Sequence, residues 1–141
     1  MEQPTSLSLA LSEFERALNG LIQALETDLS LFSDHIPDLL KNGQIQKFEY
    51  CIELAWKLGK RILEEKFGVV QNSPIPVFRE LHINNVINEQ SFLDLREAVR
   101  DRNLLSHVYR ESLFDYIHQR LPIHLASPRT FEQDVFSKFS E

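Results

Sequence analysis

The chain has 141 residues, of which 43% are hydrophobic, and a formal net charge of -6. This length fits one domain with a real core, and the negative charge excludes a global positive field that would attract nucleic acid. The single cysteine excludes an internal disulfide and a cysteine-rich zinc site. Neither a signal peptide nor a membrane-spanning run is evident, so a cytoplasmic protein with no membrane contact is expected.

A long amphipathic helix is predicted at the start of the chain. Apolar residues recur there at alternating spacings of three and four, which indicates a helix over about 7–32. We expect a connection over 34–43, because Pro37 and Gly43 are typical helix breakers.

The second predicted helix covers about 44–67, and Gly68 is a natural stop. Glu49 falls on the apolar stripe of this helix, between Ile45 and Ile52. A carboxylate on a core-facing stripe needs a partner, because burying it unpaired is costly.

The second half of the chain is also expected to be helical. Proline and capping residues delimit the predicted helices, which are 76–83, 89–109 after Asn88, 113–125 with a kink at Pro122, and a last short one opened by Ser127 and Pro128. No segment shows the sustained period-two alternation of a strand. We therefore predict an all-α fold, an antiparallel four-helix up-and-down bundle with one or two short extra helices. The bundle would occupy residues 1–126, and 127–141 would form a short helix or tail.

Four polar residues near the end of helix 89–109 form the most informative motif. Arg102 and Asn103 are followed after three residues by His107, and Tyr109 comes two residues later. Arginine offers a planar fork for phosphate oxygens, and histidine can move a proton near neutral pH. At about 100° per residue, Arg102 lies on the apolar stripe of its helix and His107 about 140° away. One straight helix does not point both at one atom unless the long Arg102 side chain bends across. We expect instead that the helix is distorted here and that a second subunit completes the site.

A basic sector lies beside this motif on the same helix. This sector contains Arg96, Arg100 and Arg110 and no acidic residue. It could contact an anion or RNA despite the net negative charge of the chain. The simpler interpretation is a solvated face in which Arg100 pairs with the nearby Glu97 or Asp101.

Each residue of the motif also has a purely structural interpretation. Arg102 could pair with Glu49 inside the bundle or at a dimer seam, and this role can coexist with catalysis. His107 alone would be a surface or packing histidine, and Tyr109 alone a core or interface tyrosine. No metal site is expected at Glu49 and Glu53, since no histidine accompanies these two glutamates at ligand spacing.

The segment from Arg102 to Tyr109 resembles the signature of the HEPN superfamily, in the branch paired with minimal nucleotidyltransferases. The stretches 45–57 and 78–80 are similar to other parts of that branch. The resemblance implies a helical bundle that forms a homodimer, with a site between subunits that cleaves RNA without metal or cofactor. It also implies a separately encoded nucleotidyltransferase antitoxin that adds AMP to Tyr109.

Our first hypothesis is accordingly a HEPN-type ribonuclease toxin of a toxin–antitoxin pair. His107 would transfer the proton, Arg102 would clamp the phosphate, Asn103 would orient the reacting groups, and Tyr109 would be the modification site. The alternative is a non-catalytic subunit that binds substrate for the nucleotidyltransferase. A third possibility is a structural homodimer with a decayed site.

Overall fold

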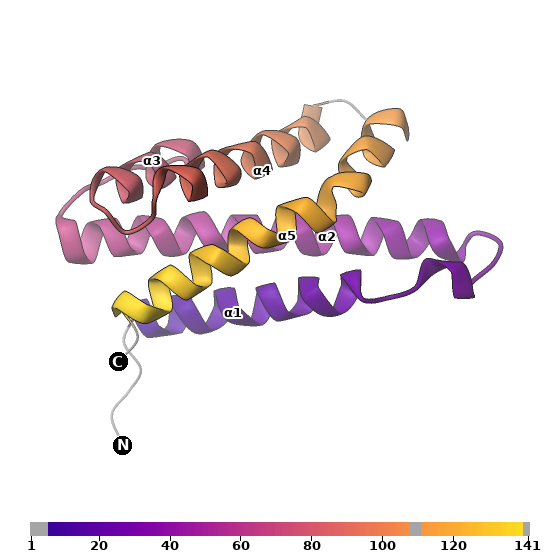
Figure 1. Ribbon diagram of the computed structural model, residues 1–141, viewed down its shortest axis with the longest axis horizontal. Helices are drawn as coiled ribbons and strands as arrows, with labels where there is room; N and C mark the ends of the chain where they lie inside the picture. Colours follow the sequence, from indigo (N-terminus) through magenta and orange to yellow (C-terminus); the bar gives the residue numbers. More distant parts are fainter. Residues whose placement is uncertain (1–5, 108–110, 140–141) are drawn as a thin grey trace, which may run out of the picture.

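The computed structural model describes residues 6–107 and 111–139, and these ranges are built from helices (Figure 1). The four long helices run in alternating directions: α1 (Ser6–Leu25), α2 (Ile36–Ile62), α4 (Glu89–His107) and α5 (Glu111–Phe139). One short helix, α3 (Pro74–Ile83), lies beside α4. The predicted all-α antiparallel bundle with a short extra helix is therefore confirmed.

The first connection lies earlier in the chain than predicted. Helix α1 ends before the expected residue 32, and Leu29–Leu31 forms a separate 3-10 turn. Helix α2 begins at Ile36, inside the predicted connection, with Pro37 in its first turn and Gly43 in its interior. Proline is tolerated in a first turn because its missing N–H would have had no intrahelical acceptor there. The prediction that these two residues act as helix breakers in a connection is wrong.

The end of α2 follows the sequence more closely. The helix widens into one π turn, Leu63–Phe67, and Gly68 then adopts a left-handed conformation with φ 64°. The N–H of Val69 donates to the carbonyl of Leu63 at 3.0 Å, which closes the helix end. Glycine carries no steric penalty in this conformation, so its role as the stop signal is confirmed.

A second predicted helix boundary, in the region of α5, is also wrong. The helices expected on either side of Ser127 and Pro128 are one continuous helix, with both Pro122 and Pro128 inside it. A proline removes a single intrahelical hydrogen bond and bends the helix, and α5 is visibly bent in Figure 1. The helix continues because Phe131 and Val135 beyond the prolines are fully buried, and their burial outweighs the local cost.

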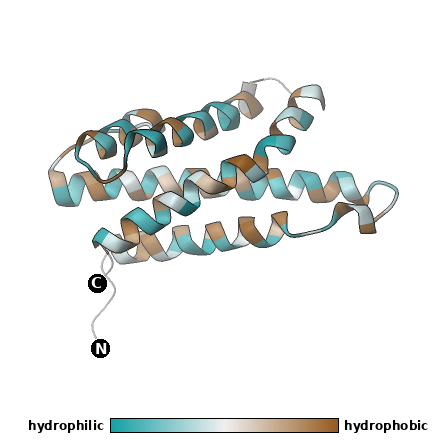
Figure 2. Cartoon of the chain, in the orientation of Figure 1, coloured by the Kyte–Doolittle hydropathy of each residue, from teal (hydrophilic) through white to brown (hydrophobic). Residues whose placement is uncertain are grey.

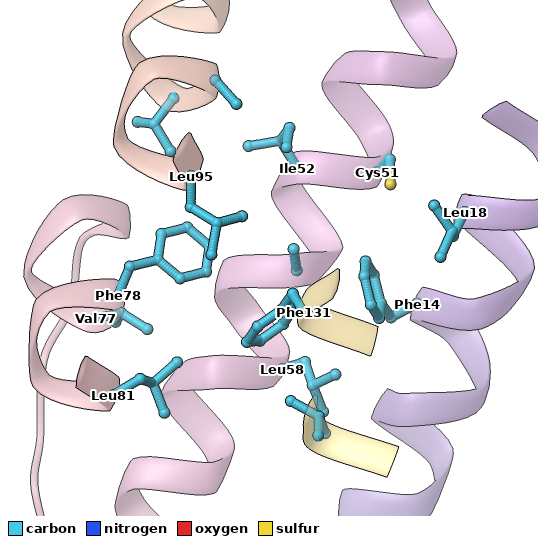
Figure 3. Packing of buried hydrophobic residues seen from close by; sticks show 14 of the residues in the cluster. Phe14, Leu18, Cys51, Ile52, Leu58, Val77, Phe78, Leu81, Leu95 and Phe131 are labelled. Carbon is cyan, nitrogen blue, oxygen red and sulfur yellow. The ribbon is translucent and has the colours of Figure 1, made fainter. Parts of the chain in front are cut away.

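Phe131 lies at the centre of the core (Figure 3). Its ring makes edge-to-face contacts with Phe14 of α1 at 5.6 Å and with Phe78 of α3 at 5.7 Å between centroids. Apolar and polar residues alternate along each helix at helical spacing, so that one face of each turns inward (Figure 2). Among the described residues, no helix combines the length and the apolarity needed to cross a membrane.

Candidate functional site

Arg102 reaches from α4 to the neighbouring α2 and binds Glu53 there. Its Nη2 donates to Glu53 Oε2 at 2.5 Å, and the two side chains are 24% and 28% exposed. Trp56 Nε1 donates to the same oxygen at 3.0 Å, and Lys57 Nζ lies 3.2 Å from the other oxygen. The guanidinium is thus held in one place near the surface, between two helices.

The positive charge of Arg102 also acts on Glu49, which lies one turn before Glu53. Burial raises the pKa of Glu49, and Arg102 opposes this shift only in part. Burial alone would also raise the pKa of Glu53, but hydrogen bonds from Trp56 and Lys57 and the charge of Arg102 outweigh it and lower that pKa. The carboxylate that bonds Arg102 is therefore Glu53, whereas the sequence had pointed to Glu49.

Two further residues of the motif, Asn103 and His107, lie on the last turns of α4. Asn103 is exposed and engaged in an interaction of its own. His107 is the last residue of α4, and its side chain lies outside the described part of the chain. Tyr109 and Arg110 also lie outside the described residues. The structure accordingly places the phosphate-binding candidate and leaves the other roles as predictions.

The basic sector of α4 is not a uniform surface. Arg100 pairs with Glu97 at 3.3 Å on the exposed face, as the simpler interpretation expected. Arg96 lies instead over the ring of Phe92, one turn earlier on the same helix. The two arginines thus differ in surroundings, although they are one turn apart.

A buried polar network beside the motif was missed in the sequence. Asp101 Oδ2 accepts a hydrogen bond from Arg120 Nε at 2.6 Å and interacts with His124 Nε2 at 2.5 Å, and both partners belong to α5. The His124 ring stacks on Phe48 of α2 at 5.4 Å. The network fastens the part of α4 that carries Arg102 to α5. Arg120 and His124 are one turn apart on their helix, and this spacing was the available signal.

The other groups that could be reactive lie in surroundings that indicate a structural role. Cys51 is fully buried, and burial raises the pKa of its thiol to about 12, so it is protonated at neutral pH. Within the described ranges, no group of three or more histidine, cysteine or acidic side chains could hold a metal ion. The chemistry that the described site offers is a positioned guanidinium beside two carboxylates.

Comparisons with known proteins agree on the fold. The model of the family described as "Nucleotidyltransferase substrate binding protein like" matches residues 9–135. No curated protein matches the chain. A solved structure from Thermus thermophilus shares 26% identity at a TM-score of 0.71, covering 91% of this chain and 99% of its own.

Two further solved structures carry descriptive names. A chain of the tri-AMPylated Shewanella oneidensis HEPN toxin in complex with MNT antitoxin has 20% identity and a TM-score of 0.77, covering 96% of this chain and 100% of its own. A chain of a mutant toxin–antitoxin MntA-HpeT has 19% identity and a TM-score of 0.76, covering 94% and 98%. At these identities the likeness concerns the fold.

Proposed function

Because the chain belongs to the nucleotidyltransferase substrate-binding protein-like family, within the nucleotidyltransferase-associated branch of the HEPN proteins, we propose that it is the toxin subunit of a HEPN toxin–antitoxin pair. Its activity would be metal-independent cleavage of RNA in the cytoplasm. The fold shared with the Shewanella oneidensis HEPN toxin supports this proposal. The observation that carries it is Arg102, fixed by Glu53 at the surface five residues before His107.

The proposed reaction is attack by a ribose 2′-oxygen on the adjacent phosphorus. His107 takes the proton from the 2′-hydroxyl, the 2′-oxygen–phosphorus bond forms, and the bond from phosphorus to the 5′-oxygen breaks. The departing 5′-oxygen takes up a proton, so the products are a 2′,3′-cyclic phosphate and a 5′-hydroxyl. Arg102 stabilises the negative charge on the phosphate oxygens, and Asn103 orients the reacting groups. A guanidinium has five N–H donors, so Arg102 can hold Glu53 and a phosphate oxygen together.

Helix geometry argues that two subunits form each site. Arg102 and His107 are separated by about 7.5 Å along the axis of α4 and about 140° around it. A pocket that uses both groups on one phosphate is most simply completed across a two-fold axis. The proposed active form is accordingly a homodimer, in which the end of α4 from one subunit faces its counterpart.

The proposed regulation is AMP transfer to Tyr109 by a separately encoded minimal nucleotidyltransferase. The phenol oxygen attacks the α-phosphorus of ATP, pyrophosphate leaves, and the phenol proton is lost to solvent. AMP at this position adds negative charge and bulk two residues from His107. Both effects oppose the binding of an RNA phosphate.

A second candidate function is a non-catalytic subunit that presents substrate to the nucleotidyltransferase. The charge compensation in the ion pair with Glu53 favours it, because it leaves Arg102 less positive charge to stabilise the additional negative charge of a transition state. The family description names substrate binding as well. In this case the polar cluster binds an anionic substrate, and all chemistry belongs to the partner.

Cleavage of RNA by the protein alone separates the two functions. Incubation with total RNA in a chelator should give cyclic-phosphate ends, and His107→Ala should abolish them while the circular dichroism spectrum stays unchanged. His35→Ala is a matched control, because His35 is exposed and lies far along the chain at the start of α2. Cleavage that survives His107→Ala contradicts the assigned role. No cleavage by the wild-type protein favours the binding subunit.

A further inference from the structure

Two arginines from different helices share one aromatic ring at the junction of α3 and α4. The Cζ atoms of Arg79, on α3, and Arg96, on α4, each lie over the Phe92 ring at 5.7 Å from its centroid. The imidazole of His82 stacks on the same ring at 6.2 Å with an interplanar angle of 9°. Three basic side chains therefore converge where the two helices lie side by side (Figure 1).

The charge of this cluster is uncompensated within the described residues. The structure gives neither Arg79 nor Arg96 a carboxylate at ion-pair distance there, whereas Arg100, Arg102 and Arg120 each have at least one. Positions three and four residues away on the same helices, where a helical partner would sit, carry no acid. The Nε of Arg96 is buried without a hydrogen-bond partner in this part of the chain. A buried donor without a partner is costly, and no acceptor among the described residues satisfies this nitrogen.

The chemistry of the cluster suits a nucleic-acid strand. A guanidinium that lies over a phenyl ring keeps its N–H donors in its own plane, where they can bind phosphate oxygens. The outer face of such a guanidinium can also stack on an unpaired base. Arg79 is exposed, so both modes are open to it.

We propose that Arg79 and Arg96 form a phosphate-binding subsite that holds single-stranded RNA away from the bond that is cleaved. The proposal rests on the proposed function and adds a second point of contact to it. Arg96 precedes Arg102 by six residues on α4, which is about 9 Å along the helix axis, so a short strand can reach both. The subsite lies toward α3, whereas Arg102 faces α2.

The salt dependence of RNA binding tests this subsite. The probe is a single-stranded RNA oligonucleotide with 2′-O-methyl groups, which cannot be cleaved by the proposed reaction. For single strands, the slope of log Kobs against log salt falls by about 0.7 for each lost phosphate contact. The double variant Arg79→Gln and Arg96→Gln should bind more weakly, with a slope shallower by about 1.4. Arg79→Lys with Arg96→Lys should keep most of the slope.

A matched control removes two positive charges elsewhere. Arg61 and Arg129 are on α2 and α5, where Arg61 hydrogen-bonds Ser6 of α1 and Arg129 lines a hollow beside α1. The variant Arg61→Gln with Arg129→Gln has the same net charge as the test variant and should leave the slope unchanged. Thermal unfolding establishes that both variants are folded. If the double variant fails to fold, the exposed Arg79→Gln alone should lower the slope by about 0.7.

Each result has a distinct meaning. An unchanged slope in the test variant, an equal loss in the control, or no measurable binding by the wild-type protein overturns the subsite. Unchanged RNA binding with lost binding of the nucleotidyltransferase also overturns it, and assigns the cluster to protein contact. Cleavage of unmodified RNA is measured separately. Its absence refutes the proposed ribonuclease but leaves the slope comparison valid.

Discussion

Glu53 and Arg102 form an ion pair that joins α2 to α4 across 49 residues of sequence, with Nη2 and Oε2 2.5 Å apart. Trp56 and Lys57 bind the same carboxylate, so Glu53 is the centre of a small network rather than one member of an isolated pair. The network fixes the position of the guanidinium before any ligand arrives. Preorganisation of this kind lowers the ordering cost that binding would otherwise carry.

Replacing Glu53 by Gln should destabilise the fold at neutral pH. The amide keeps the shape but removes the charge that Arg102 bonds, so the free energy of unfolding should fall by about 1–3 kcal/mol. The pKa of Glu53 is lowered in the folded protein, so its contribution is complete above the unfolded pKa near 4.5 and is lost as pH falls through the folded pKa. Urea unfolding from pH 7 to pH 3 should show that the free energies of unfolding of the wild-type protein and of Glu53→Gln converge as the pH falls. A gap that stays constant over this range contradicts the assignment.

Glu49→Gln should act in the opposite direction. Burial raises the pKa of Glu49, so its ionised form costs stability above the folded pKa, and this cost disappears below about pH 4.5. The neutral amide removes the cost, and the free energy of unfolding at pH 7 should rise by less than about 1 kcal/mol, since the group is partly solvated. The two glutamates are one turn apart and provide mutual controls. A loss of stability as large as that of Glu53→Gln would show that Glu49 is the true partner of Arg102.

The sequence predicted that Arg102 needs a carboxylate on α2, but it pointed to Glu49, and the partner is Glu53. Glu49 and Glu53 differ by four residues, which places them about 40° apart on the helix, and periodicity alone does not separate such neighbours. The choice depends on the height at which α4 crosses α2, which is set by packing between distant parts of the chain. The end of α2 at Gly68 and the cap at Asn88, whose Oδ1 accepts from the N–H of Ser91 at 2.8 Å, were predictable because they depend on local chemistry.

The role of Asp101 shows the same limit. On a helical wheel it belongs with Asp94 and Glu97, on the side away from the basic residues, and it resembles a solvated acid. It is nevertheless buried, because α5 covers this side of α4 and supplies Arg120 and His124. The residue pattern of one helix does not predict where another helix packs against it. The Asp101 network could therefore be identified only in the tertiary structure.

Asp101→Asn should therefore be among the most damaging polar substitutions. Its carboxylate is 6% exposed and binds two basic groups, so the free energy of unfolding should fall by about 3 kcal/mol, the low end for breaking a buried ion pair. Glu97→Gln, on the exposed face of the same helix, should cost less than about 1 kcal/mol. Urea denaturation followed by circular dichroism compares the two variants. Similar losses in both would mean that the Asp101 network adds little to stability.

Two glycines of α2 should respond in opposite ways to alanine. A Cβ at Gly59 would lie 2.8 Å from Leu81 Cδ1 and 2.9 Å from Val77 Cγ1, because α3 packs closely on α2 there. Gly59→Ala should lower the free energy of unfolding by about 1–3 kcal/mol through overpacking, despite the better helix propensity of alanine. A Cβ at Gly43 would meet nothing within 4 Å, so Gly43→Ala should raise stability by about 1 kcal/mol. Thermal unfolding of the two variants measures both effects. Destabilisation by Gly43→Ala would place that residue outside a helix, and stabilisation by Gly59→Ala would mean that α3 does not approach α2 as closely as described.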